Sequence, residues 1–195
     1  MTDNAPDLAR RRALTVATCA AGGAATAAVA WPFLASLAPS ERARALGAPA
    51  ETDIGALQPG ELMTVEWQGK PVWILRRTDE MLRTLGDHDP LLADPESAHS
   101  IQPPYCENPG RSIKPEILVA VALCTHLGCV PSYRPQGDPA AGIAHAGFYC
   151  PCHASKFDVA ARVYRNVPAP TNLVIPRHTY LSDARLLIGE DRSGA

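Results

Sequence analysis

The sequence lacks an excess of basic residues. Its 195 residues include 18 Lys and Arg against 20 Asp and Glu, a formal net charge of -2. Nucleic-acid-binding domains usually carry a basic excess, so the composition does not support that class of function. Internal repeats are also missing, as are low-complexity tracts outside one Ala-rich stretch. One domain of moderate size, with room for a hydrophobic core, is therefore expected.

Charge is absent from a long run near the N-terminus, residues 13–38. A membrane span needs roughly 20 apolar residues, so we expect this run to be a single-pass transmembrane anchor. Arg10, Arg11 and Arg12 end the preceding segment, 1–12, and favour a cytoplasmic N-terminus. The arginine pair before a weakly apolar run also resembles a twin-arginine (Tat) export signal. We expect the rest of the chain on the periplasmic side of a bacterial inner membrane. Cleavage of the run as a signal peptide stays an open alternative.

Residues 39–52 are predicted to form a flexible hinge linker. Ser40 can cap a short helical turn that Gly47 ends, and Pro49 favours extended chain after it.

Residues 53–195 are predicted to form one mainly β, antiparallel domain. The counts of 19 Pro and 14 Gly favour many turns and short strands. A hairpin is expected where residues 62–67 and 71–77 flank Gln68-Gly69-Lys70. Further strands are expected at 117–123, 143–149, 173–176 and 185–189, a short helix at 78–85, and an ordered loop insertion at 86–116.

Two motifs, CTHLGC at 124–129 and CPCHASKFD at 150–158, each follow a predicted strand. They hold six good metal ligands, although a compact site takes four: Cys124, His126, Cys129, Cys150, Cys152 and His153. Cys124 can converge with His126, and Cys150 with His153. The remaining two cysteines would then lie close together. Outside the cytoplasm a disulfide between them would persist and would stabilise the paired loops by about 2–4 kcal/mol.

The identity of the metal follows from the spacing of the ligands. Structural zinc sites usually pair ligands as C-x-x-C or H-x-x-x-H, and neither pair occurs here. The patterns C-x-H-x-x-C and C-x-C-H instead match a Rieske 2Fe–2S centre, in which two His replace two Cys on one iron.

On these motifs, together with RSIKPE at 111–116 and VPAP at 167–170, the chain resembles the Rieske iron–sulfur subunit of ubiquinol–cytochrome c reductase, the cytochrome bc complex. The resemblance covers most of the chain, including the anchor and the linker. It implies a Rieske-type β domain with a cluster-binding subdomain, and a loop at 168–170 that covers the cluster. The implied cluster ligands are Cys124, His126, Cys150 and His153, with a disulfide between Cys129 and Cys152.

The function implied by this resemblance is oxidation of ubiquinol beside cytochrome b. The electron then passes to a cytochrome c-type haem subunit, within a dimeric complex that translocates protons. His153 is expected to hydrogen-bond the quinol, with His126 as the alternative. Leu127 is expected either at the docking surface or packed within its own loop.

Two positions depart from the pattern of the family. Ala154 stands where Gly is usual, and a positive φ there would strain it. Ser155 is kept and can donate to a bridging sulfide, but Phe157 replaces a frequent Tyr and lacks its hydroxyl. Since hydrogen bonds to the sulfurs raise the reduction potential, a lower potential is expected. Cys106 has no evident partner.

Three alternatives remain on sequence grounds. One is another exported Rieske subunit, such as the small subunit of arsenite oxidase. A soluble Rieske ferredoxin is disfavoured, since such proteins lack the anchor and the extra cysteine pair. The third is a zinc-stabilised structural domain.

Overall fold

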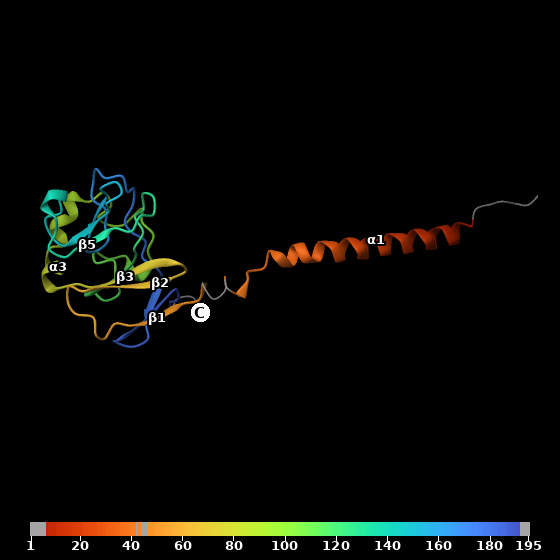
Figure 1. The fold of residues 1–195 in the computed structure, drawn as a ribbon, viewed down its shortest axis with the longest axis horizontal. Coiled ribbons are helices and arrows are strands. Elements are labelled where there is room, and N and C mark those ends of the chain that lie inside the picture. Colours follow the sequence, from red (N-terminus) through yellow and green to blue (C-terminus); the bar gives the residue numbers. More distant parts are fainter. Residues whose placement is uncertain (1–6, 42, 44–46, 192–195) are drawn as a thin grey trace, which may run out of the picture. The chain divides into compact units, whose positions relative to one another are not determined.

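The computed structural model describes residues 7–41, 43 and 47–191 (Figure 1). Two units, residues 1–45 and 46–195, are described separately. In the first, helix α1 runs from Leu8 to Ser36, starting earlier than the predicted apolar run. The Asp7 carboxylate caps it by accepting from the N–H groups of Ala9 and Arg10. The helix is long and apolar enough to cross a membrane.

The predicted linker falls partly outside the described residues, because 42 and 44–46 are not among them. Within it the Ser40 hydroxyl accepts from the Ala43 N–H at 3.1 Å, the contact that a helical cap makes. Strand β1 (Ala50–Asp53) begins before the predicted linker ends at residue 52. It does so because its residues pair with strand β9, from Ala50 opposite Ile188 to Asp53 opposite Arg185.

Within residues 47–191 the second unit contains three antiparallel sheets of three strands each, which confirms the mainly β prediction. Their orders are β1-β9-β8, β2-β3-β4 and β5-β6-β7. The remaining strands are β2 (Leu62–Trp67), β3 (Lys70–Arg76), β4 (Ile117–Val121), β5 (Ser132–Arg134), β6 (Gly147–Tyr149), β7 (Lys156–Asp158), β8 (His178–Tyr180) and β9 (Arg185–Ile188).

The predicted hairpin is present as β2 and β3. Trp67 pairs with Lys70 across a two-residue turn. Gln68 and Gly69 have φ of 54° and 69°, the left-handed pair that the tightest hairpin loops require.

Side chains of the central sheet β2-β3-β4 alternate between two hydrophobic cores. On one face Leu118 and Ala120 of β4 share a core with Phe148 and Phe157, from the sheet β5-β6-β7. On the other face Ile117, Val119 and Val121 share a core with Leu186 and Ile188 of β9. Every residue of β4 is buried, because both faces of the strand are covered. The strand therefore leads directly from the interior into the first of the two motifs.

Segment 173–176 is not a strand, so that prediction was wrong. The N–H of Leu173 bonds to Ala161, the N–H of Ile175 bonds to Ile101, and the carbonyl of Val174 accepts from Val121. These bonds go to three different segments, so no ladder forms. Strand β9 pairs with β8 on one side and with β1 on the other.

Other predicted elements are shorter than expected, including β4, which ends at Val121, and β9, which ends at Ile188. The strand expected at 143–149 is reduced to β6, and the helix expected at 78–85 to α3 (Asp79–Arg83). Gly86 does not end the helical chain but begins a 3₁₀ helix, η1 (Gly86–Leu91). Further short 3₁₀ helices are η2 (Pro104–Cys106), inside the predicted loop insertion, and η3 (Pro139–Ala141).

Candidate metal centre

The two cysteine motifs form loops with the same backbone pattern. The first cysteine loop, residues 122–131, joins β4 to β5, and the second, residues 150–155, joins β6 to β7. In each, the N–H of the first cysteine donates to the residue five positions on: Cys124 to Cys129, and Cys150 to Ser155. In each, the carbonyl of that cysteine accepts from the residue four positions on. Both loops therefore turn back tightly around the first cysteine.

That fourth position requires a left-handed backbone in both loops. It is occupied by Gly128, with φ of 81°, in the first loop and by Ala154, with φ of 60°, in the second. The φ of Ala154 is therefore positive, as the expected strain required. In this backbone region the Cβ of an alanine lies too close to the neighbouring carbonyl.

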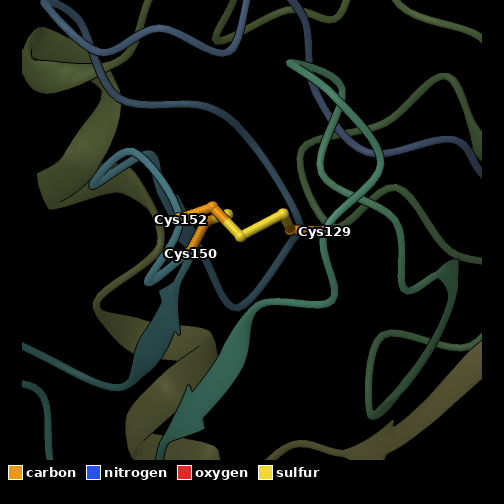
Figure 2. Close-up of side chains that lie close together, drawn as sticks. All are labelled: Cys129, Cys150 and Cys152. Carbon is orange, nitrogen blue, oxygen red and sulfur yellow. A yellow bond between two sulfur atoms is a disulfide. The ribbon is translucent and has the colours of Figure 1, made fainter.

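A disulfide between Cys129 and Cys152 joins the two loops (Figure 2). This is the pairing that the family resemblance implies. The bridge lies near the surface: Cys129 is half-buried and Cys152 is exposed.

The other two cysteines lie deeper. Cys124 is 3% exposed and Cys150 is 2% exposed. Burial raises the pKa of the Cys124 thiol and the neighbouring Cys150 adds to the rise, while the His126 N–H and the Ser155 hydroxyl oppose it. Two thiols from different loops thus face each other, beside donors that favour a thiolate.

The two histidines form a second pair. The rings of His126 and His153 meet edge to face, with centroids 4.7 Å apart. Nδ1 of His126 is buried and has no hydrogen-bond partner among the residues that the structure describes. A buried polar atom without a partner is costly, and coordination to a metal would satisfy it. The donor set of two thiols and two imidazoles fits a Rieske 2Fe–2S cluster.

If metal ligands were chosen only by the distances between their atoms, three cysteines would be chosen in place of the two thiols and two imidazoles. The sulfurs of Cys129, Cys150 and Cys152 lie within 4.8 Å of one another. Two of them are joined in the disulfide and cannot be thiolate ligands, so this group is not a metal site while the bridge is intact.

The Pro-rich segment is attached to both cysteine loops. The N–H of Ala169 donates to Oγ of Ser155 at 3.0 Å, and Oγ1 of Thr125 donates to the carbonyl of Thr171 at 2.7 Å. Segment 167–171 therefore lies across the ends of both loops, where the resemblance places a covering loop.

Phe157 and Leu127 occupy opposite environments. Phe157 is fully buried, in the same hydrophobic core as Cys124 and Cys150. Leu127 is 71% exposed and Val130 is 50% exposed, so the tip of the first loop presents apolar side chains to its surroundings. The packed-loop alternative for Leu127 was therefore wrong.

Three buried arginines hold the turn that follows β7, and no sequence pattern pointed to this role. Arg77 donates to the carbonyl of Val159, and Arg111 donates to the carbonyls of Ala160 and Ala161. Burial lowers the pKa of Arg77 and of Arg111 to about 10. Arg111 opens the RSIKPE run, but that run had marked only a family resemblance.

The third of them, Arg162, pairs with a buried carboxylate. Its Nε donates to Oδ2 of Asp158 at 2.8 Å, while Oδ1 of Asp158 accepts from the N–H groups of Ala160 and Arg162. Burial by itself would raise the pKa of Asp158. The nearby His88 ring, 3.8 Å away, and the Arg162 guanidinium outweigh burial and lower that pKa.

Comparison with known proteins agrees with the donor set of a Rieske cluster. Residues 1–40 match the family model "Ubiquitinol-cytochrome C reductase Fe-S subunit TAT signal", and residues 105–178 match "Rieske [2Fe-2S] domain". The chain is 56% identical over 188 residues to the "Ubiquinol-cytochrome c reductase iron-sulfur subunit" of Allochromatium vinosum, covering 95% of this chain and 91% of that protein. Identity to the same-named protein of Blastochloris viridis is 39% over 183 residues, 92% of each chain.

A plant mitochondrial relative is also similar over the greater part of the chain. The "Cytochrome b-c1 complex subunit Rieske-1, mitochondrial" of Arabidopsis thaliana is 40% identical over 157 residues, which cover 80% of this chain and 51% of that protein.

Replacing Ala154 by Gly should raise the free energy of unfolding by about 1 kcal/mol, because glycine adopts the left-handed backbone without the Cβ contact. Urea unfolding measures the change. Ala144→Gly is the matched control, since Ala144 is also an exposed loop alanine but has no positive φ. That variant should lose about 0.5–1 kcal/mol. Equal losses in both variants would contradict the strain at Ala154.

Asp158→Asn should lower the free energy of unfolding at pH 7 by about 1.5–3 kcal/mol, since it removes the buried carboxylate that bonds to Arg162 and leaves the half-exposed Asp89 as the remaining ionic partner of that guanidinium. The lowered pKa of Asp158 means that its contribution is present above the ordinary aspartate pKa of about 4 and is lost as the pH falls below it. Urea unfolding at pH 7 and pH 3 should therefore show a smaller acid loss in the variant. The exposed Asp183→Asn should stay close to wild type at pH 7. A wild-type acid loss retained in full by Asp158→Asn would show that other carboxylates cause it.

Proposed function

Because the chain belongs to the family of Rieske iron–sulfur subunits of ubiquinol–cytochrome c reductase, we propose that Cys124, His126, Cys150 and His153 hold its 2Fe–2S cluster. As a member of that family the chain is a subunit of the cytochrome bc1 complex and transfers electrons from ubiquinol. The observation that carries the ligand assignment is the orphaned, buried Nδ1 of His126, next to a second imidazole and two buried thiols.

A 2Fe–2S cluster held by these four residues would supply one-electron transfer at a potential suited to a quinol, because neutral imidazoles would replace two thiolates. The surrounding residues have separate tasks. Ser155, fixed by the Ala169 N–H, directs a hydroxyl at the cysteine sulfurs. The two cysteine loops and segment 167–171 keep water from the sulfur side, where both thiols are buried.

The histidine side is the open side of the site. His153 is exposed and His126 is half-buried. We infer that the ring nitrogen of His153 that does not bind iron accepts a hydrogen bond and then a proton from the quinol. Ligation through Nδ1 of His126 would leave its Nε2 for the same role, so His126 remains the second candidate. Leu127 and Val130 would face the apolar quinone pocket of a cytochrome b subunit.

The N-terminal unit would attach the β domain to a membrane. Residues 1–40 match a Tat-signal model, and α1 has the length of a membrane span. We infer that α1 stays as an anchor in a bacterial inner membrane with the β domain on the periplasmic side. Residues 39–49 would then act as the hinge, so that the domain can move between the quinol site and a cytochrome c-type haem subunit of a dimeric complex. The zinc and arsenite oxidase alternatives have no comparable support.

The ligand assignment is tested by single replacements in the full-length protein, each of Cys124→Ser, His126→Asn, Cys150→Ser and His153→Asn. Each should abolish the 2Fe–2S signal in low-temperature EPR of the reduced protein and lower its content of iron and labile sulfide. Cys19→Ser and His99→Asn are matched controls, because both residues are exposed and outside the loops. A full cluster in any of the four variants would remove that residue from the ligand set.

Phe157→Tyr should raise the reduction potential, since its hydroxyl would reach the core that holds Cys124 and Cys150. A hydrogen bond stronger by about 1 kcal/mol in the reduced state corresponds to about 40 mV. Redox titration followed by EPR measures the shift. Tyr133→Phe is the control, because it removes a hydroxyl that donates to the carbonyl of Gly60 and not to a cysteine sulfur, and it should leave the potential unchanged. An unshifted potential in Phe157→Tyr would refute the proposed influence.

A further inference from the structure

A free thiol lies beside the disulfide that joins the two cysteine loops. The sulfurs of Cys129, Cys150 and Cys152 are all within 4.8 Å of one another, and Cys150 is not in a bridge (Figure 2). Exchange between a thiol and a disulfide needs the attacking sulfur to reach one sulfur of the bridge. Here the approach to van der Waals contact requires a movement of at most about an ångström, since non-bonded atoms are in contact at roughly 3.5–4 Å.

We propose that Cys150 and the Cys129–Cys152 bridge form a thiol–disulfide exchange triad, which moves the bridge to Cys129–Cys150 whenever Cys150 does not hold iron. The proposal rests on the proposed function in one respect, the assignment of Cys150 as an iron ligand. With iron bound, the Cys150 sulfur is occupied and the triad is inactive.

The exchange is balanced without an added oxidant or reductant. The Cys150 thiolate attacks Sγ of Cys129, a new S–S bond forms between them, and the bond between Cys129 and Cys152 breaks. Cys152 leaves as a thiolate and takes up the proton that Cys150 gave up. One disulfide and one free thiol are present before and after the exchange.

Attack at Cys129 is favoured over attack at Cys152 by the product that each would give. Attack at Cys152 would link two residues of the same loop, two positions apart, and would release the connection between the loops. Attack at Cys129 keeps the two loops joined, so the entropy advantage of the closed loop is retained. The leaving residue, Cys152, is exposed and its thiol can be accommodated by solvent.

The product keeps the fold but loses a ligand. Cys150 is consumed, while the released Cys152 belongs to the same loop yet not to the proposed ligand set. A chain in this form cannot take up the cluster until the bridge returns or is reduced. Iron binding at Cys150 therefore competes with formation of the Cys129–Cys150 bridge, unless iron binds before any disulfide forms.

The test follows the disulfide in the full-length protein, purified in detergent without thiol reagents. Iron is removed anaerobically with a chelator at fixed pH, and samples are quenched in acid, denatured and alkylated. Non-reducing proteolysis and mass spectrometry then identify the bridged pair. The iron-loaded protein should contain only Cys129–Cys152. After stripping, Cys129–Cys150 should appear and alkylated Cys152 should increase with it. Cys106, free in both states, serves as the labelling reference.

Two variants separate the exchange from the ligand assignment. Cys150→Ser lacks the attacking thiol and should keep Cys129–Cys152 throughout. Cys124→Ser lacks another proposed ligand but keeps the attacking thiol, so it should show the shifted bridge. In stripped wild-type protein the fraction that reloads iron and sulfide should fall in proportion to the shifted fraction.

The outcomes distinguish a failure of the proposed exchange from a failure of the proposed ligand assignment. Stripped wild-type protein in which Cys150 is alkylated and Cys152 stays bridged would overturn the exchange, while its iron content before stripping would leave the ligand assignment intact. A Cys150→Ser variant that retains a full cluster would instead overturn the ligand assignment on which the exchange rests.

Discussion

The proposed ligands come together only because the two cysteine loops lie side by side, and the rest of the domain depends on this contact. Neither cysteine loop carries more than half of the proposed donors, and the loops follow strands of different sheets, β4 and β6. The Cys129–Cys152 bridge joins them covalently, and segment 167–171 bonds to both. The shared turn around Cys124 and Cys150 directs both thiols inward, so the thiols are buried while the histidines remain on the open side.

Two alanines with a left-handed backbone lie where surrounding contacts hold the chain in place. Ala154 keeps a left-handed conformation because the disulfide and the hydrogen bond from its N–H to Cys150 fix the loop on both sides. Ala161 has the same φ of 60° inside the turn that Arg111 holds. In both places surrounding contacts offset a local cost of about 1–2 kcal/mol.

Much of the candidate site could be predicted because ligand types and spacings are local properties of the sequence. The hairpin at Gln68-Gly69 and the buried strand β4 follow from equally local patterns. The failures arise where partners are distant: segment 173–176 reads as a strand but bonds to three segments, and β1 begins inside the predicted linker because β9 pairs with it. The buried roles of Arg77, Arg111 and Arg162 depend on carbonyls 49 to 82 residues away in most cases, which no local pattern encodes.

The three guanidinium groups also bear on how the domain opens. They come from β3's end, from the loop insertion and from the turn itself, and they meet at residues 158–161. Partial opening of this turn would leave buried cations facing apolar surroundings. Local fluctuations are therefore suppressed, and the amides of Ala160 and Arg162 should exchange with deuterium only when the central sheet also unfolds. The turn at residues 158–161 and the central sheet β2-β3-β4 then unfold together as one cooperative unit.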